Sequence, residues 1–263
     1  MLDHLAPARR RLVVVVVAAL VALVLALAAV LIGRWQGSPD PVAQDRVGPV
    51  VVLAGYGGDT RSLDPIVNEL REQGRQVTVF PPVGNNTGDL VEQAQRLDRF
   101  VDNLLRGGDT SSVDIVGYSA GGVVARLWVR DHGGASAARR VLTLGSPHHG
   151  TGVAVLATEA AGCPVACQQL EADSDLLRRL NAGDETPDGP QWATIRTTND
   201  QVVTPSTSAD LTGALTMVVQ SFCPQATTSH GQLPTSPVVL AALHTVLGTG
   251  PPVAPAPGSV DCG

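Results

Sequence analysis

Residues 113–122 constrain the fold of this chain more than any other segment, because they combine three local signals. Four residues that favour a strand, Val113 to Val116, run into the turn Gly117-Tyr118-Ser119-Ala120-Gly121, and an amphipathic helical stretch follows. This order is typical of a nucleophile elbow, a sharp strand-to-helix turn that exposes a strained serine. The glycines leave room beside that serine, and the helix directs backbone N–H groups towards it. A glycine-rich turn around an ordinary serine is the alternative, but strand and helix on either side favour Ser119 as a nucleophile.

Short apolar runs alternate with helical patterns along the rest of the chain, which indicates βαβ units and a parallel sheet. Val50 to Leu53 is apolar at every position, as is typical of a strand buried on both faces. Further strands are predicted at 76–80, 113–116, 141–144, 192–197 and 216–220, and helices at 63–73, 89–106, 122–130, 168–180 and 238–247. We therefore expect a doubly wound α/β fold with its functional residues at the carboxyl ends of the strands.

The N-terminal segment predicts export. Leu12 to Ile32 carries no charge and would span roughly 30 Å as a helix, while Arg9 to Arg11 favour a cytoplasmic N-terminus. An uncleaved signal anchor is the favoured interpretation. The alternative is a cleaved signal peptide with Ala26-Leu27-Ala28 as its cleavage site, although signal peptides usually have a shorter apolar region of about 7–15 residues. We expect residues 1–32 to form this segment and 33–48 a linker.

The remaining residues, 49–263, suit one α/β domain with a sizeable core. The net charge is −6, and beyond the first dozen residues the basic side chains, all arginine, form no stripe. This argues against a nucleic-acid partner. We expect a monomer that meets the membrane through its N-terminal segment, either anchored there with an extracytoplasmic domain or secreted if the segment is cleaved.

Four cysteines follow the apolar segment: Cys163, Cys167, Cys223 and Cys262. Export would place them in an oxidising compartment, which predicts two disulfides, and three pairings are possible. The simplest joins Cys163 to Cys167 and Cys223 to Cys262, so that the second bridge fastens the proline-rich tail at 251–257. Zinc binding is the alternative, but no second close pair of Cys or His lies beside Cys-x₃-Cys.

A serine nucleophile needs a base within hydrogen-bond reach and an acid that orients the base. After such an elbow, the expected chain order is serine, acid, histidine. His230 fits as the base, in a loop between the predicted 216–220 strand and the last helix, although an exposed loop histidine is the alternative. The other histidines lie before the apolar segment, within helices or before every plausible acid: His4, His132, His148, His149 and His244.

Asp200 is the predicted acid, because it directly follows the strand predicted at 192–197. Asp184 and Asp188 precede that strand in a turn rich in glycine and proline, and Asp210 suits a helix cap or a turn. An oxyanion hole needs two preorganised donors. We expect these to be the backbone N–H groups of Ala120 and Tyr56.

About forty residues separate Pro147 from Trp192, which is long for a connection. They include Cys163 and Cys167 and lie beside the predicted site. We interpret this insertion, near 147–191, as a wall of the substrate site. A mobile lid and a surface excursion stapled by a disulfide are the alternatives.

These motifs resemble those of the α/β-hydrolase superfamily, and more narrowly of small bacterial secreted lipases and esterases, over about residues 48–248. The similar segments are 50–58, 113–122, 142–151, 199–203 and 229–231. The family often has His-Gly where this chain has Ala54-Gly55, and often His at the position of Tyr118, which bears on substrate fit rather than on the triad. The resemblance implies a reduced α/β-hydrolase fold with about six mostly parallel strands.

The predicted reaction is hydrolysis of a carboxylic ester, from a lipid or another hydrophobic ester, through an acyl-enzyme on Ser119, with His230 as base and Asp200 as its partner. No cofactor or metal is required, and no ligand cluster for a structural calcium ion is visible. Acyl transfer to an alcohol would use the same residues. A binding module with an inactive triad is the remaining alternative.

Overall fold

The computed structural model describes residues 7–36, 42–154 and 162–262, which belong to two units, Met1–Pro39 and Asp40–Gly263. The first unit contains helix α1 (Pro7–Gln36), which includes the uncharged run and extends into the segment predicted as a linker. Side chains of α1 are described only at positions 11, 13 and 15–28. Within the described residues, no helix combines the length and hydropathy required to cross a membrane. The signal anchor or signal peptide therefore stays a prediction.

In the described part of the second unit, six strands form one sheet in the order β2-β1-β3-β4-β5-β6, and all neighbouring strands are parallel. The strands are β1 (Val50–Leu53), β2 (Val77–Val79), β3 (Val113–Tyr118), β4 (Ala138–Leu144), β5 (Gln191–Arg196) and β6 (Leu215–Val218). This confirms the predicted α/β fold and strand number. The chain runs from β1 to the edge strand β2 and returns to β3 on the other side of β1. In such sheets, ligands bind where the strand order reverses.

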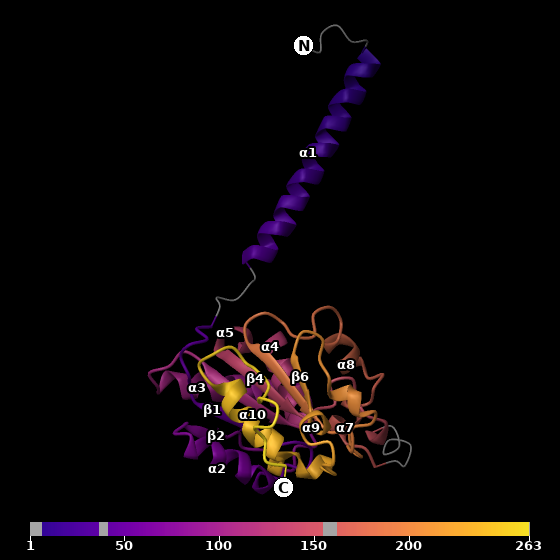
Figure 1. Ribbon diagram of the computed structural model, residues 1–263. Helices are drawn as coiled ribbons and strands as arrows, with labels where there is room; N and C mark the ends of the chain where they lie inside the picture. Colours follow the sequence, from indigo (N-terminus) through magenta and orange to yellow (C-terminus); the bar gives the residue numbers. More distant parts are fainter. Residues whose placement is uncertain (1–6, 37–41, 155–161, 263) are drawn as a thin grey trace. The chain divides into compact units, whose positions relative to one another are not determined.

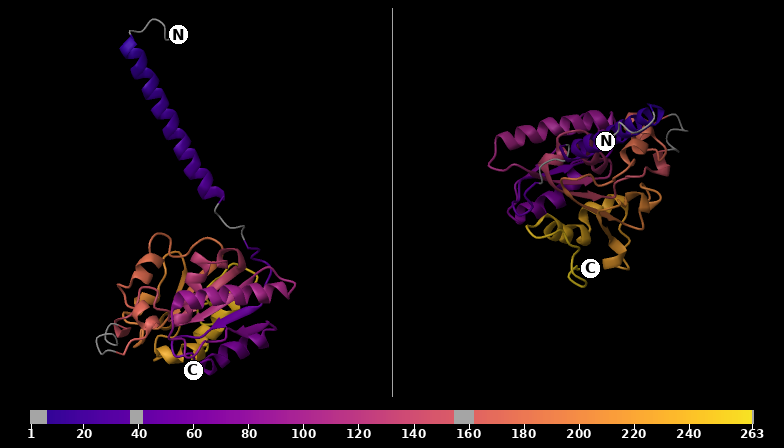
Figure 2. Two further views of the ribbon diagram at one scale, coloured as in Figure 1. Left: turned by 180° about the vertical axis from the view of Figure 1, so that it is seen from behind. Right: turned by 90° about the horizontal axis from the view of Figure 1, so that it is seen from above.

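Helices cover both faces of the sheet (Figure 1). One face packs against α2 (Asp64–Glu72) and α10 (Pro237–Leu247), and the other against α3 (Leu90–Arg106) and α4 (Ala120–Asp131), as the two rotated views show (Figure 2). Strand β1 explains why both faces are apolar: Val50 and Val52 join one core, and Val51 and Leu53 the other. Successive side chains of a strand point to opposite faces.

Three predicted elements differ from the structure. The helix predicted at 168–180 is two short helices, α7 (Val165–Gln169) and α8 (Asp175–Leu180), because the Ser174 side chain accepts a hydrogen bond from Leu177 N and starts a new helix. Strand β4 begins at Ala138, earlier than predicted, and includes two buried arginines. The strand predicted at 216–220 ends at Val218 and continues as α9 (Val219–Phe222).

Both disulfides have the pairing that was considered simplest. Cys163 is bonded to Cys167, and Cys223 is bonded to Cys262. The second bond joins the residue after α9 to the C-terminal tail.

A buried ionic cluster lies at the amino ends of the strands. Asp114 of β3 accepts hydrogen bonds from Arg139 of β4 at 2.9 and 2.5 Å and from Arg75 at 2.5 Å. Arg139 also donates to the carbonyl oxygens of Gln44 and Leu247, at 2.9 and 2.8 Å. The cluster therefore fastens the end of α10 and part of the segment predicted as a linker to the sheet. A buried charge needs such partners because burial removes its hydration.

Candidate active site

The turn at Ser119 has the geometry of a nucleophile elbow. Ser119 follows β3, precedes α4 and adopts φ 53° and ψ −127°, a conformation that is strained for a residue other than glycine. A Cβ atom at Gly117 would lie 2.6 Å from the Cα of Gly122, and one at Gly121 would lie 2.7 Å from the Leu53 carbonyl oxygen. Helix α4 can approach the sheet closely only because both positions are glycine.

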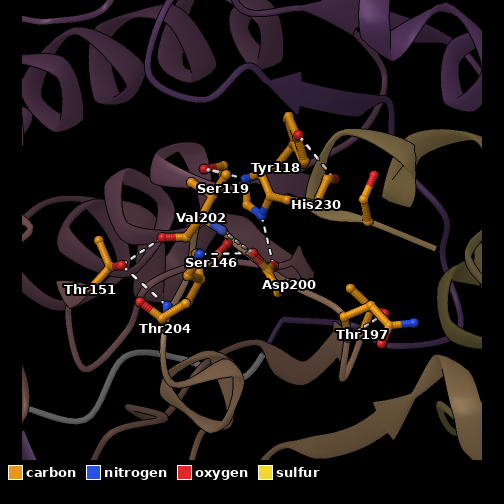
Figure 3. Close-up of polar contacts among 12 residues, drawn as sticks. Tyr118, Ser119, Ser146, Thr151, Thr197, Asp200, Val202, Thr204 and His230 are labelled. Atoms are coloured by element: carbon orange, nitrogen blue, oxygen red, sulfur yellow. Dashed lines mark hydrogen bonds and ion pairs between the residues drawn. The ribbon is translucent and has the colours of Figure 1, made fainter. Parts of the chain in front are cut away.

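The structure brings the three predicted polar residues together in one line (Figure 3). Ser119 Oγ lies 3.0 Å from His230 Nε2, and His230 Nδ1 lies 2.7 Å from Asp200 Oδ2. His230 was predicted to lie in a loop. It is instead the first residue of the 3₁₀ helix η3 (His230–Thr235). If the carboxylate accepts from Nδ1–H, Nε2 carries no proton and faces the Ser119 hydroxyl as an acceptor.

Two backbone N–H groups hold the Asp200 carboxylate. Val202 N and Val203 N donate to Oδ1, at 2.9 and 2.7 Å, which leaves Oδ2 for the imidazole. Gly145, at the end of β4, makes space for this pair. Its φ is +52°, and a Cβ there would lie 3.2 Å from His230 Nδ1 and 3.3 Å from Asp200 Oδ2. Gly145 was not among the predicted site residues, although it lies within the 142–151 motif.

Tyr118 contacts the imidazole and its backbone. The two ring centroids are 5.2 Å apart, and the Tyr118 hydroxyl donates to the His230 carbonyl oxygen at 3.2 Å. Burial raises the pKa of Tyr118 to about 12, and the negative charges of Asp200 and Asp59 add to this effect. The phenol therefore remains a protonated donor at physiological pH.

The other candidate acids lie elsewhere. Asp210 pairs with Arg196 at 2.7 Å, and Asp184 Oδ1 accepts from Thr186 N in a local turn. Within the described residues, no group of three His, Cys, Asp or Glu side chains could hold a metal ion.

Two of the other histidines have side-chain partners away from Ser119. His148 is fully buried beside Thr143, with Nε2 3.0 Å from the threonine Oγ1. Burial places the pKa of His148 well below its ordinary value, and the charge of Arg126 lowers it further. His244 pairs with Glu69 near the protein surface.

The two predicted oxyanion donors lie at the start of α4 and in the turn after β1. Ala120 is the first residue of α4, so its N–H has no acceptor within the helix. In the turn after β1, Gly57 N donates to Asn85 O and Gly58 N to Gly55 O, and among the described residues no acceptor is found for Tyr56 N. These two N–H groups are therefore available to a ligand.

Asn86 supports the turn after β1, and the sequence analysis missed it. Its side chain is buried and donates to the Gly55 carbonyl oxygen at 3.4 Å, while its φ of 53° is one that asparagine tolerates. The run Gly84-Asn85-Asn86 is a turn signal, but the contact with Gly55 is 31 residues away in sequence.

The insertion between β4 and β5 is fastened to the helices beside it. Gln169 accepts from Leu90 N at 2.8 Å and donates to Asp89 at 3.0 Å, at the start of α3. From α4, Arg126 donates to Asn181 Oδ1 at 2.9 Å. Residues 155–161 of the insertion lie outside the described part of the chain.

Comparison with known proteins gives one family and several similar folds. The model of the family described as lipase (class 2) matches residues 48–241. Lipase B of Aspergillus fumigatus is 16% identical with a TM-score of 0.72, and the match covers 85% of this chain and 58% of that one. Lipase BlEst2 of Bacillus licheniformis in its mature form is 16% identical with a TM-score of 0.64, covering 81% and 95%. No curated protein sequence matches. At these identities, the structural likeness establishes the fold alone.

Proposed function

The chain belongs to the class 2 lipase family, and on that premise we propose that it hydrolyses carboxylic esters through a Ser-His-Asp triad and an acyl-enzyme. One observation carries the proposal. The two contacts of 2.7 and 3.0 Å connect Asp200 through His230 to Ser119, at the end of β3 beside the point where the strand order reverses. A serine held in this way has both the base and the orienting acid that it needs.

In the proposed reaction, Ser119 Oγ attacks the ester carbonyl carbon while His230 Nε2 takes the hydroxyl proton. Asp200 stabilises the imidazolium that forms. His230 then gives the proton to the alcohol oxygen, the alcohol leaves, and the acyl group remains on Ser119. A water molecule attacks this acyl-enzyme with His230 again as base, and the carboxylic acid is released.

The developing oxyanion would be bound by the N–H groups of Tyr56 and Ala120. Such donors accelerate the reaction because they already point to where negative charge appears. The position of Ala120 supports this arrangement, since it directly follows the strained Ser119 and is the first residue of α4, where backbone N–H groups are free to bind an anion.

Exposed apolar side chains favour a hydrophobic substrate. They lie on connections that leave the carboxyl ends of strands: Tyr56, Val83, Val153, Val165 and Val202. The match to the lipase family supports a hydrophobic ester as the substrate. We assign the insertion that carries Val153 and Val165 as a wall of the substrate site.

The compartment forms part of the proposal. Two disulfides indicate an oxidising environment, so we place the domain outside the cytoplasm, exported by residues 1–32 as a signal anchor or signal peptide. The mass of the protein recovered from cells that express the full chain separates these two cases. A cleaved signal would remove the N-terminal residues.

The test of the reaction is release of p-nitrophenol from p-nitrophenyl esters of increasing acyl length by the full chain. Ser119→Ala should reduce kcat by about 10⁶-fold, as loss of the nucleophile does in other triad enzymes. Ser136→Ala, at an exposed serine, is the control and should leave kcat unchanged. Retention of hydrolysis by Ser119→Ala would contradict the proposal.

A further inference from the structure

Thr151 stands at the start of the insertion, and its side chain reaches the segment that carries Asp200 (Figure 3). Its hydroxyl donates to the Val202 carbonyl oxygen at 2.6 Å and accepts from Thr204 N at 3.2 Å. The residue is buried, with 7% of its surface exposed. One hydroxyl therefore satisfies a donor and an acceptor of the same short segment.

The same segment supplies the donors of the carboxylate. Val202 donates its N–H to Asp200 Oδ1 and accepts from Thr151 through its own carbonyl oxygen. The Val202 side chain is 44% exposed, so its own packing contributes little to holding this residue. Hydrogen bonds on both sides of Val202 therefore determine where its N–H points.

We propose that Thr151 is a positioning residue for Asp200: by fixing residues 202–204, its hydroxyl keeps Asp200 Oδ2 against His230 Nδ1. The inference rests on the proposed function, because it concerns the acid of the proposed triad. Thr151 touches none of the reacting atoms and acts through the carboxylate.

Thr151 also connects this segment to the insertion. Thr151 N donates to Leu170 O at 2.9 Å, and Gly152 N donates to Thr204 O at 3.0 Å. Leu170 directly follows α7, which is bonded to the start of α3 through Gln169. The proposed acid and the proposed substrate wall thus share one hydrogen-bonded link at Thr151.

The hydrogen bonds of the Thr151 hydroxyl determine which substitutions test the inference. A hydroxyl can donate to Val202 O and accept from Thr204 N at once, and serine can do the same. Valine keeps the branched shape of threonine but can do neither. Thr151→Val loses both hydrogen bonds to residues 202–204. For this variant in the full chain, we expect kcat for ester hydrolysis to fall about tenfold, with KM changed less than about twofold. Thr151→Ser should recover most of kcat.

A matched control exists in β5. The Thr194 hydroxyl donates to the Ala209 carbonyl oxygen, also at 2.6 Å and also buried, but it does not contact the Asp200 segment. Thr194→Val removes the same kind of bond. It should lower thermal stability as Thr151→Val does and leave kcat of the folded protein unchanged.

The decisive measurement is a double-mutant cycle with Asp200→Asn. If Thr151 acts through the carboxylate, Thr151→Val should cost no further kcat once Asp200 is replaced, because the effects of residues in one hydrogen-bond network are not additive. A full tenfold further loss in that background would overturn the inference. Wild-type kcat in Thr151→Val, or no recovery in Thr151→Ser, would overturn it as well.

Two outcomes keep the inference separate from the proposed function. If the wild type hydrolyses no ester, or Ser119→Ala retains hydrolysis, the proposed function fails. If the wild type is active and Ser119→Ala is not, only the positioning role is tested. Should Thr151→Val not fold, the comparison of Thr151→Ser with Thr151→Ala replaces it, and equal kcat values in that pair would contradict the inference.

Discussion

Two buried aspartates lie at opposite ends of the sheet, and each accepts hydrogen bonds from basic side chains of a different kind. Asp114, at the amino end of β3, accepts from Arg139 and Arg75, whereas Asp200, beyond the carboxyl end of β5, accepts from His230 and two backbone N–H groups. An arginine in a protein does not lose its proton, but a histidine does so near neutral pH. The first cluster therefore holds a fixed charge, whereas the role proposed for the second is proton transfer.

The two clusters also differ in what the partner side chain contacts with its remaining nitrogen atoms. The remaining donors of Arg139 bind backbone carbonyl oxygens at the end of α10 and before β1, so this cluster joins chain segments. The remaining nitrogen of His230 faces Ser119, whose backbone is strained. Asp114 lies at the start of β3, and Ser119 directly follows the strand, five residues or about 16 Å further along an extended chain. One strand thus connects an ionic cluster that fastens chain segments to the proposed active site.

Of the two aspartate variants, Asp200→Asn should give the larger effect, and mainly on activity. The amide can still accept from Val202 N, but it cannot stabilise an imidazolium or hold the required tautomer, so we expect kcat to fall about 10⁴-fold. The free energy of unfolding, measured in urea, should change by less than about 2 kcal/mol, because the side chain keeps its size and one acceptor. Activity within tenfold of wild type would contradict the assignment of Asp200 as the acid.

Asp114→Asn should show the opposite behaviour. It leaves the buried guanidinium of Arg139 and the partly exposed one of Arg75 without a counter-charge. Breaking a buried ion pair from one side costs about 3–5 kcal/mol of stability. At a temperature where the variant remains folded, kcat per folded molecule should match the wild type. A loss of kcat comparable with that of Asp200→Asn would remove the distinction between the two ends of the sheet.

Apolar runs in the sequence identify all six strands but not all of their ends. The strand at Val50–Leu53 was correct at both ends because each residue is apolar and buried. The start of β4 was missed because Arg139 and Arg140 interrupt the apolar pattern, although both are fully buried. Their head groups bind carbonyl oxygens about a hundred residues away in sequence, which no local pattern can reveal.

In the candidate site, too, local patterns reveal some residues and not those whose role depends on distant contacts. Ser119, Asp200 and His230 could be proposed because each follows a recognisable strand and the expected chain order applies. Thr151 could not, because its contact with Val202 joins residues 51 positions apart and depends on where the insertion begins. Chain order thus identifies residues that lie at strand ends, and only packing identifies the residues that hold them in place.

Tyr118→Phe tests how much the tyrosine hydroxyl contributes to the position of His230. The variant keeps the ring beside the imidazole and loses the hydrogen bond to the His230 carbonyl oxygen, which is worth about 1 kcal/mol. We expect kcat/KM to fall between about threefold and tenfold, measured with a p-nitrophenyl ester. Tyr118→Leu, which also removes the ring contact, should be worse. Equal values for the two variants would mean that the ring does not help to place His230.

Glu185→Gln should have the smallest effect, and it tests whether an acid–histidine pair matters outside the proposed triad. Glu185 Oε1 lies 2.7 Å from His149 Nε2, the same distance that joins Asp200 to His230, but His149 is partly exposed, and its other ring nitrogen lies 3.3 Å from the carbonyl oxygen of Ser208 rather than from a serine hydroxyl. We therefore expect no change in kcat. Burial would raise the pKa of Glu185, but hydrogen bonds from His149 and Thr212 outweigh it, and the pKa is lower than its ordinary value of 4.5.

A folded-state pKa below the unfolded value stabilises the protein above about pH 4.5, and this contribution is lost as pH falls through the folded pKa. Urea unfolding at pH 6 should thus show a wild-type advantage of less than about 1 kcal/mol over Glu185→Gln, because the pair is partly exposed. The advantage should shrink towards pH 3, while Glu72→Gln, at an exposed helix end, should show no such trend. An advantage that grows on acidification would mean that the pair does not favour the ionised carboxylate, and the resemblance to the Asp200 pair would then be one of distance alone.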